Sequence, residues 1–289
     1  MICGMIFLHI RGFLGAFALL CTAASIWPEN PGANSPAMAN SVEIVEQMQR
    51  HNQSQAKGLA GYKALRHYQV EYKGFSATIA AKMDVEVNYD AASGKSFRIV
   101  SQSGSNLLCN KVLKRAVDSE KEASQDKGGN ALTTANYRFQ LAGSENLNGR
   151  TAYILDVEPL TASKFLYRGR IWVDAADFAV VKMETEPAKN PSFWISRTLI
   201  HYTSAPVNGF WLPREVRSET KVRIGGTAVL TIDYGSYQVE PNDRDQGSGV
   251  RVQGSVKEQE SAAVDSTLSA GEAVLVRVAS CVTVAIRRP

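Results

Sequence analysis

Alternation of apolar and polar residues is the feature that most restricts how this 289-residue chain can fold. From Ala77 to Tyr89 every second residue is apolar or aromatic, and most of the residues between them are polar. Because successive side chains of a β-strand point to opposite faces of a sheet, this run predicts a long strand with one buried face. Shorter runs with the same period follow as far as residue 239, and they predict about ten strands in all.

The connections between these runs are short, and two of them contain the turn pairs Asn148-Gly149 and Gly225-Gly226. Short connections require antiparallel pairing, and a twisted sheet of so many strands tends to curl. We therefore expect an α+β fold in which a large curved antiparallel sheet forms an incomplete β-barrel, with helices covering its concave side.

Two helices are predicted to supply that cover. Asn40 with Glu43 three residues later has the form of a capping box, which predicts a helix over residues 41–57 with Val42, Val45 and Met48 in its buried stripe. A second apolar stripe, which includes Leu107 and Leu108, predicts a helix over residues 105–124.

Composition places the chain among globular proteins and argues against a nucleic-acid partner. Apolar residues make up 44% of the chain and charged residues 21%, which is enough apolar material for a substantial core. The net charge is only +4, and the basic residues are scattered rather than gathered in runs with aromatic residues between them.

The two ends of the chain differ from the middle. Residues 1–39 contain an apolar run and then a Pro-rich spacer, which predicts a secretory signal peptide cleaved after Ala24 or Ala39, with an uncleaved membrane anchor as the alternative. Residues 241–289 are polar and rich in Gly and Ser before a short apolar segment, which predicts a disordered tail. We expect one folded domain over residues 40–240, located outside the cytoplasm, whose Cys109 either pairs with Cys281 of the tail or stays free.

Residue types that carry catalysis or bind metals do not form a recognisable set. The four histidines are dispersed, and the sequence has no nucleophile-elbow, phosphate-loop or dinucleotide-binding motif. Asp174 and Asp177 bracket a turn, where a carboxylate accepts backbone N–H groups, so we assign them a structural role. We expect neither enzymatic activity nor a cofactor or metal site.

The segment from residue 167 to residue 185 is predicted to be a hairpin with apolar side chains on both faces. If Val173 pairs with Phe178, then Ile171 pairs with Val180, and Met183 lies on the opposite, partly wet face. The more apolar face either belongs to a solid core or lines a cavity for an apolar guest, and periodicity does not distinguish between the two.

The hairpin pattern R-I-W-V-D-x-x-x-F of residues 170–178, with its flanking strands, resembles the LolA-like outer-membrane lipoprotein-sorting proteins, a group that includes LolB and the amino-terminal domain of RseB. The resemblance covers residues 41–240. It implies a monomeric, periplasmic carrier that holds the acyl chains of a lipid or lipoprotein and exchanges them with an inner-membrane exporter or an outer-membrane acceptor. A regulatory sensor like RseB is the alternative that it implies, and an unrecognised enzyme is a distant third.

A carrier of this kind needs an apolar cavity, because each methylene group exposed to water costs about 0.8 kcal/mol. The family's Arg-Pro pair before the third strand is replaced around Ala92 and Ser93, so its gating mechanism is not carried over, and Arg98 is a possible substitute. The candidate cavity residues are Met83, Val85, Val87, Phe97, Ile99, Phe139, Leu141, Tyr153, Leu155, Ile171, Val173 and Val180.

Overall fold

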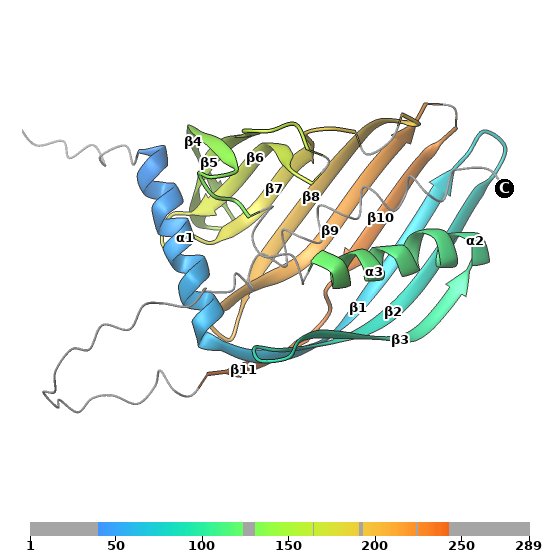
Figure 1. Ribbon diagram of the computed structural model, residues 1–289, viewed down its shortest axis with the longest axis horizontal. Coiled ribbons are helices and arrows are strands. Elements are labelled where there is room, and N and C mark those ends of the chain that lie inside the picture. The colour runs from blue at the N-terminus through green and yellow to red at the C-terminus, as the bar shows by residue number, and fades with distance from the viewer. Residues whose placement is uncertain (1–39, 124–130, 164, 191–192, 224, 243–289) are drawn as a thin grey trace, which may run out of the picture. The chain divides into compact units, whose positions relative to one another are not determined.

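One antiparallel sheet of 11 strands dominates the computed structural model, which describes residues 40–123, 131–163, 165–190, 193–223 and 225–242 (Figure 1). This confirms the predicted α+β fold with a large curved sheet. The predicted signal peptide, the disordered tail and Cys281 lie outside the described residues. The strands are β1 (Leu59–Lys73), β2 (Thr78–Asp90), β3 (Gly94–Gly104), β4 (Tyr137–Leu147), β5 (Arg150–Pro159), β6 (Tyr167–Asp174), β7 (Val180–Pro187), β8 (Ile195–Val207), β9 (Phe210–Val222), β10 (Thr227–Asp233) and β11 (Tyr237–Pro241).

The strand order explains why the barrel is incomplete. The order is β3-β2-β1-β10-β9-β8-β7-β6-β5-β4, so β3 and β4 are the two edges. Strand β1 is long enough to pair with two partners on one side, since β11 pairs with its first half and β10 with its second half. The hydrogen-bonded ladder therefore runs from one edge to the other without closing.

Helix α1 (Ser41–Gly58) begins where the sequence predicts it. The side chain of Asn40 accepts a hydrogen bond from the backbone N–H of Val42 at 3.2 Å, as an N-cap residue does. The buried stripe consists of Ile44, Val45 and Met48, whereas Val42 is 54% exposed. The prediction for Val42 is wrong because this residue lies about 200° around the helix from Ile44.

The second predicted helix is one helical segment in three parts, α2 (Asn106–Leu108), the π-helical turn η1 (Cys109–Leu113) and α3 (Lys114–Ala123). Leu108 faces the sheet together with Val112 and Leu113, and all three are buried. Leu107 was expected in the same stripe but is 53% exposed, because it lies about 100° around the helix from the buried Leu108.

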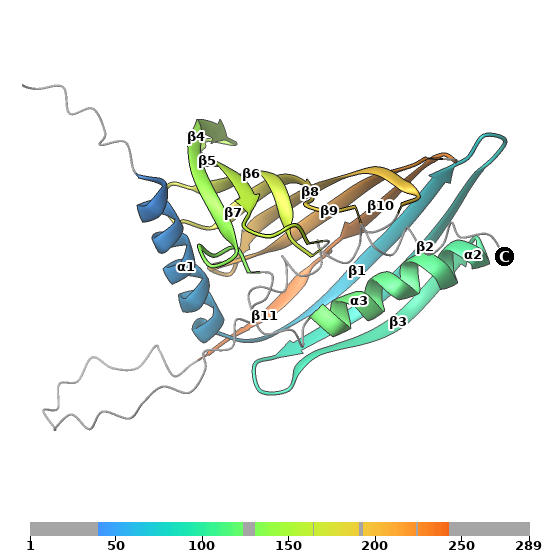
Figure 2. The same ribbon diagram turned by 45° about the horizontal axis from the view of Figure 1, so that its top comes forward.

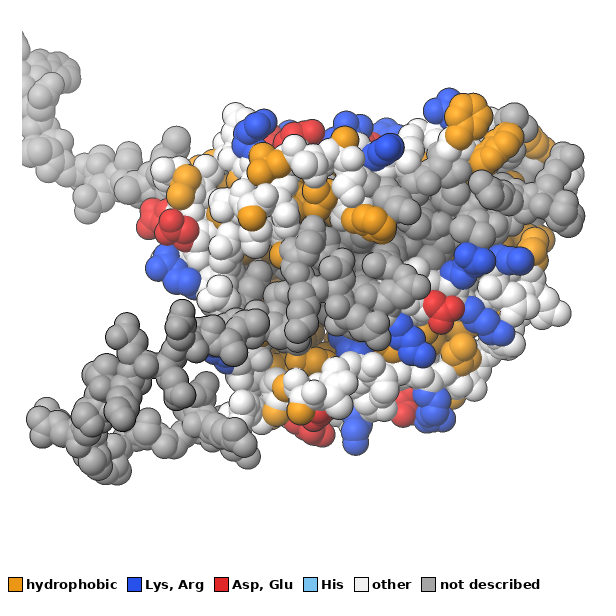
Figure 3. Space-filling view, viewed as in Figure 1, with side chains coloured by type: hydrophobic (Ala, Val, Ile, Leu, Met, Phe, Trp, Pro, Cys, Tyr) orange, Lys and Arg blue, Asp and Glu red, His pale blue; other side chains and the backbone are white. Residues whose placement is uncertain are grey.

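Both helical segments lie on the same side of the sheet but over different strands (Figures 1 and 2). Helix α1 contacts β4 and β1, whereas η1 contacts β1, β2 and β3. The buried apolar side chains of the helices and of the sheet's inner face form one continuous cluster. Apolar side chains also reach the surface, and some of them gather over the end of the sheet that carries the β1–β2 connection (Figure 3).

The hairpin of β6 and β7 has a different register from the predicted one. Val173 is opposite Val180, Ile171 is opposite Met183, and an irregularity lies between Trp172 and Val173. Met183 is therefore on the inner face and 2% exposed, contrary to our expectation. The turn predicted between Asp174 and Asp177 is too short because the carboxylate of Asp174 accepts hydrogen bonds from the N–H groups of residues 176 and 177, which holds a wider turn.

Replacement of Gly169 by alanine should destabilise the protein more than replacement of Gly143. Both glycines have positive φ angles, of 139° and 144°, so an alanine is strained at either position. A Cβ atom on Gly169 would lie 2.3 Å from the carbonyl oxygen of Glu184, whereas one on Gly143 would have no atom within 4 Å. We expect Gly169→Ala to lower the free energy of unfolding in urea by about 1–3 kcal/mol more than Gly143→Ala; equal losses would contradict the close approach of β6 and β7.

Candidate functional site

The inner face of the sheet brings together most of the residues that the sequence predicts to line a cavity. Met83, Val85, Val87, Leu155, Ile171 and Val173 are buried in the apolar cluster, and Phe97, Phe139, Leu141, Tyr153 and Val180 pack against it half-buried. Ile99 does not join them, because it lies on the edge strand β3 and is 43% exposed.

This inner face is larger than the area beneath the described helices. Ten strands about 4.8 Å apart and roughly ten residues long present a face of roughly 1,400 Å². Two helical segments of 18 residues each, Ser41–Gly58 and Asn106–Ala123, cover only about 540 Å² if each is about 10 Å wide. More than half of the inner face thus lies beyond the helices, and its side chains are mostly apolar, with buried Thr and Ser side chains on β7 to β9.

A buried ion pair joins the sheet to helix α3. The guanidinium of Arg66, on the inner face of β1, donates from Nη1 to both carboxylate oxygens of Glu120 on α3, at 2.5 and 2.6 Å. The side chains are 1% and 2% exposed. An ion pair removed from water to this degree depends on further partners to offset its desolvation.

Those further partners come from two strands and from the connection between β10 and β11. Lys95 Nζ of β3 lies 3.5 Å from Glu120, and the hydroxyl of Tyr68 on β1 donates to the same carboxylate at 3.3 Å. The guanidinium of Arg66 also lies 4.5 Å from the centre of the Tyr234 ring, within the range of a cation–π contact. Two buried cations thus share one carboxylate at this point of the inner face.

Burial and charge act in opposite directions on Glu120. Burial by itself raises the pKa of this carboxyl group, but the charges of Arg66 and Lys95, with the hydrogen bonds that they donate, outweigh it and hold the pKa below its ordinary value of 4.5. Burial is also the main reason that the pKa of Tyr68 is raised, so this phenol stays protonated. At neutral pH Glu120 is therefore ionised and ties α3 to the sheet.

Our sequence reasoning missed this cluster, although a signal was present. Arg66 occupies an inward position of the β1 alternation, between Ala64 and Tyr68. Glu120 lies four residues after Ala116, on the stripe of the helix that faces the sheet. Arg98, named as a substitute for the family's arginine, is instead 67% exposed and pairs with Glu86 on the outer face.

Helix α1 is held to the sheet by weaker polar contacts. The side-chain oxygen of Gln55 accepts a hydrogen bond from the backbone N–H of Trp211 on β9 at 2.9 Å. The indole of Trp211 donates to Asp177 at 3.0 Å, and Arg150 bridges Asp177 and Asp174. The structural role predicted for the two aspartates is confirmed, since both belong to a network that holds the β6–β7 turn and its neighbours.

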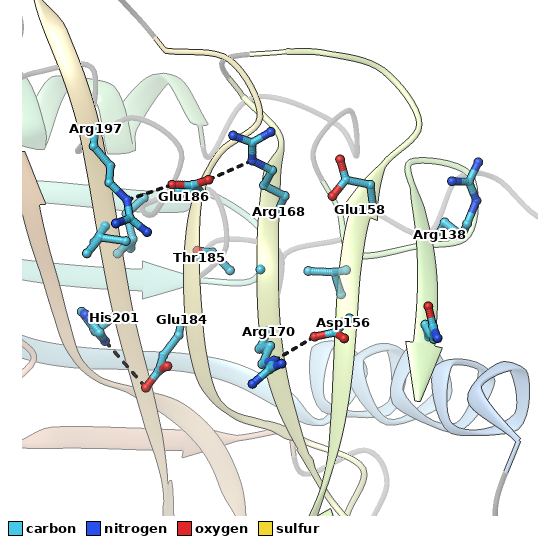
Figure 4. A pocket seen from close by; sticks show the side chains of 15 residues that line it. Arg138, Asp156, Glu158, Arg168, Arg170, Glu184, Thr185, Glu186, Arg197 and His201 are labelled. Atoms are coloured by element: carbon cyan, nitrogen blue, oxygen red, sulfur yellow. Dashed lines mark hydrogen bonds and ion pairs between the residues drawn. The ribbon is translucent and has the colours of Figure 1, made fainter. Parts of the chain in front are cut away.

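The opposite face of β4 to β8 carries a hollow of about 710 Å³ lined by charged side chains (Figure 4). Arginines and carboxylates alternate across the strands and pair with one another. Arg168 and Arg197 both bind Glu186, at 2.9 and 3.2 Å, and Arg170 binds Asp156 at 2.9 Å. Such cross-strand pairs stabilise a solvated face of the sheet, and Glu158 is drawn on the same face without a marked ion pair.

Metal-binding groups are not gathered at either face. Within the described parts of the chain, no three His, Cys, Asp or Glu side chains come together in a way that would hold a metal ion. The thiol of Cys109 is buried and lies 3.6 Å from the carbonyl oxygen of Ser103. No helix in the described ranges is long and apolar enough to cross a membrane.

Comparison with known proteins finds similarity in fold but not in sequence. No protein-family model and no curated protein matches the sequence. A domain provisionally described as an outer membrane lipoprotein-sorting protein from Vibrio parahaemolyticus is 10% identical, with a TM-score of 0.37 over 70% of this chain and 94% of its own. A LolA superfamily protein from Nitrosomonas europaea is 14% identical, with a TM-score of 0.34 over 70% and 94%. The Pseudomonas aeruginosa complex of MucA and MucB is 8% identical, with a TM-score of 0.22 over 68% and 99%. The proteins that the chain is similar to thus include members of the LolA-like group that its sequence resembles.

Replacement of Glu120 by glutamine should loosen helix α3. The change leaves Arg66 and Lys95 buried without a carboxylate, and breaking a buried pair in this way costs about 3 kcal/mol. We expect faster amide hydrogen exchange in residues 114–123 and unchanged exchange in helix α1. The matched control is Glu86→Gln, which breaks an exposed pair with Arg98; equal exchange in the two variants would show that Glu120 does not hold the helix.

The cost of that substitution should depend on pH. Because the pKa of Glu120 is lower in the folded protein than its ordinary value of 4.5, its carboxylate stabilises the fold above that pH and loses the effect as the pH falls through the folded-state pKa. The difference in unfolding free energy between the unmodified protein and Glu120→Gln should be largest near neutral pH and shrink below about pH 4.5. Urea titrations over this range measure the difference, and a constant value would contradict the assignment.

Proposed function

We propose that this domain binds the acyl chains of a lipid or lipoprotein noncovalently and carries them between membranes outside the cytoplasm. The observation that supports the proposal is the excess of apolar inner surface over the area that the described helices cover. Half-buried side chains such as Phe139, Leu141 and Tyr153 lie within this surface, where an acyl chain would bury them further.

The free energy of transfer explains why such a surface suits this cargo. A chain of about 15 methylene groups costs about 12 kcal/mol to expose to water. Surface hydrogen bonds do not offset such a cost, because each contributes only about 1 kcal/mol net. Strands that present apolar side chains side by side provide the required area without a chemical reaction.

The polar contacts of the helices allow cargo to enter and leave. Helix α1 has hydrogen bonds to β9 from a single side chain, Gln55. Helix α3 is tied to β1 by the Arg66–Glu120 pair, which is specific in geometry but gains little net stability once desolvation is counted. In our proposal, a helix held in this way moves aside at moderate cost when cargo enters.

A regulatory protein that binds a membrane partner and senses lipoprotein is the alternative function. It uses the same inner face, so the acyl-binding test is shared by both functions. Binding of an inner-membrane protein whose affinity changes when the interior is filled with lipid would favour the sensor. Transfer of cargo from one vesicle population to another would favour the carrier.

A charge placed on the half-buried part of the inner face should prevent cargo binding. Phe139 on β4 packs against the apolar cluster, and the next residue, Gln140, is exposed on the opposite face. We expect Phe139→Glu to weaken the binding of an uncharged, environment-sensitive apolar probe by at least about 10-fold, because a buried unpaired carboxylate costs more than 1.4 kcal/mol.

The matched control is Gln140→Glu, which adds the same charge to the same strand and should leave binding unchanged. Circular dichroism establishes that both variants fold, and mass spectrometry of lipid extracted from the purified protein identifies natural cargo. If the unmodified protein binds neither lipid nor probe, the proposal fails and the interior is a filled core. If both variants bind equally well, cargo does not occupy this face.

A further inference from the structure

The two ends of the sheet differ in their exposed apolar side chains. Ten large apolar side chains are exposed in the described parts of the chain. Six of them lie in or beside the connections at the end where β1 leads into β2, and we call them the apolar rim: Phe75, Leu107, Leu160, Phe165, Phe193 and Trp194. The other four lie in helix α1 or within strands. None of the ten lies in a described connection at the opposite end.

The register of the strands places these connections along one edge. Lys73 at the end of β1 is opposite Thr227 at the start of β10, which is opposite Lys221 near the end of β9. Tyr167 at the start of β6 is likewise opposite Pro187 at the end of β7. The β1–β2, β5–β6, β7–β8 and β9–β10 connections therefore leave the sheet together, where Figure 3 shows apolar and basic side chains close to one another at the surface.

The centre of the apolar rim is an ordered group rather than a set of loose side chains. Phe193 and Trp194 meet edge to face with ring centres 5.7 Å apart, and the guanidinium of Arg223 lies 5.2 Å from the centre of the Phe193 ring. The backbone N–H of Arg223 donates to the carbonyl oxygen of Trp194 at 2.8 Å, which joins two of the connections. Phe193 is nevertheless 75% exposed, and Phe75 at the tip of the β1–β2 hairpin is 89% exposed.

The connections at the two ends of the sheet also differ in their charged residues. The rim connections, residues 74–77, 105–108, 160–166, 188–194 and 223–226, contain no Asp or Glu in their sequence. Lys189 and Arg223 are exposed among them. The connections at the opposite end, counted in the same way, contain one acidic residue, Asp177, and no Lys or Arg, while acidic residues of the strands flank the connections at both ends. A surface with aromatic side chains and cations but no carboxylates is complementary to a membrane interface with anionic lipid headgroups.

We propose that the apolar rim is a membrane-docking surface, which inserts Phe75, Phe193 and Trp194 into the interface of a bilayer that contains anionic lipid. Lys189 and Arg223 then face the lipid phosphates. This inference goes beyond acyl-chain carriage, because it rests on the exposed end of the sheet and not on the interior. If the domain both carries acyl chains and docks through the apolar rim, the docked domain presents one end of its curved sheet to the bilayer that supplies or receives the cargo.

The test measures binding of the full chain to vesicles of phosphatidylcholine, with and without phosphatidylglycerol. We expect binding to be stronger with the anionic lipid and to weaken as salt is added. The double variant Phe75→Ser/Phe193→Ser should bind about 10-fold or more weakly, because interfacial binding scales with the apolar area that is buried. The matched control, Val42→Ser/Val100→Ser, removes two exposed apolar side chains, on helix α1 and on β3, and should bind as the unmodified protein does.

A second measurement reports on the rim itself. In anionic vesicles with brominated acyl chains, tryptophan fluorescence should be quenched, and Trp194→Phe should remove part of that quenching. Equal vesicle binding by the rim and control variants, or quenching that Trp194→Phe leaves unchanged, would overturn the proposal and favour a protein partner at the rim. Binding of the uncharged apolar probe should be unaffected in the rim variants, so loss of docking and loss of cargo binding are distinguished.

Discussion

The area of the sheet's inner face is the constraint on which the rest of the structure depends. A run of strands that each bury one apolar face produces a surface that two helices of 18 residues cannot cover. The sheet curls, and the apolar side chains of its inner face form one cluster with those of the helices. The features that matter for function, namely the half-buried apolar residues, the helices on the inner side and the two unlike ends, follow from this geometry.

The inner face carries two kinds of buried polar group: hydroxyl side chains on β7 to β9, and an ion pair that holds a helix in place. Arg66 and Glu120 define where α3 lies on β1, and their geometry is more specific than that of apolar contacts, which tolerate sliding. Helix α1 has no comparable ion pair among the described contacts and depends on its apolar stripe and Gln55. The two helices therefore differ in how they are fixed, and loss of charge on Glu120 affects only one of them.

The difference between the two ends gives the domain a direction. The outer face of β4 to β8 is covered by cross-strand pairs of arginine with carboxylates, in which opposite charges largely balance. The connections at the rim end lack carboxylates and expose aromatic rings. Such a molecule is well solvated along its outer face and has apolar contact area at one end, which is the arrangement that directional contact with a lipid surface requires.

The alternation of residues determined the fold class, the strand count to within one, the two helices and most of the inward-facing residues, because side-chain period follows directly from backbone geometry. It did not determine the register of β6 with β7, which depends on how Asp174 shapes the turn, or the place of Ile99, which depends on β3 being an edge. Only the tertiary structure decided that Arg66 meets Glu120, 54 residues later, and that connections far apart in the chain form one rim. Periodicity records which face a residue occupies, whereas contacts between distant segments arise only when the strands have paired and curved.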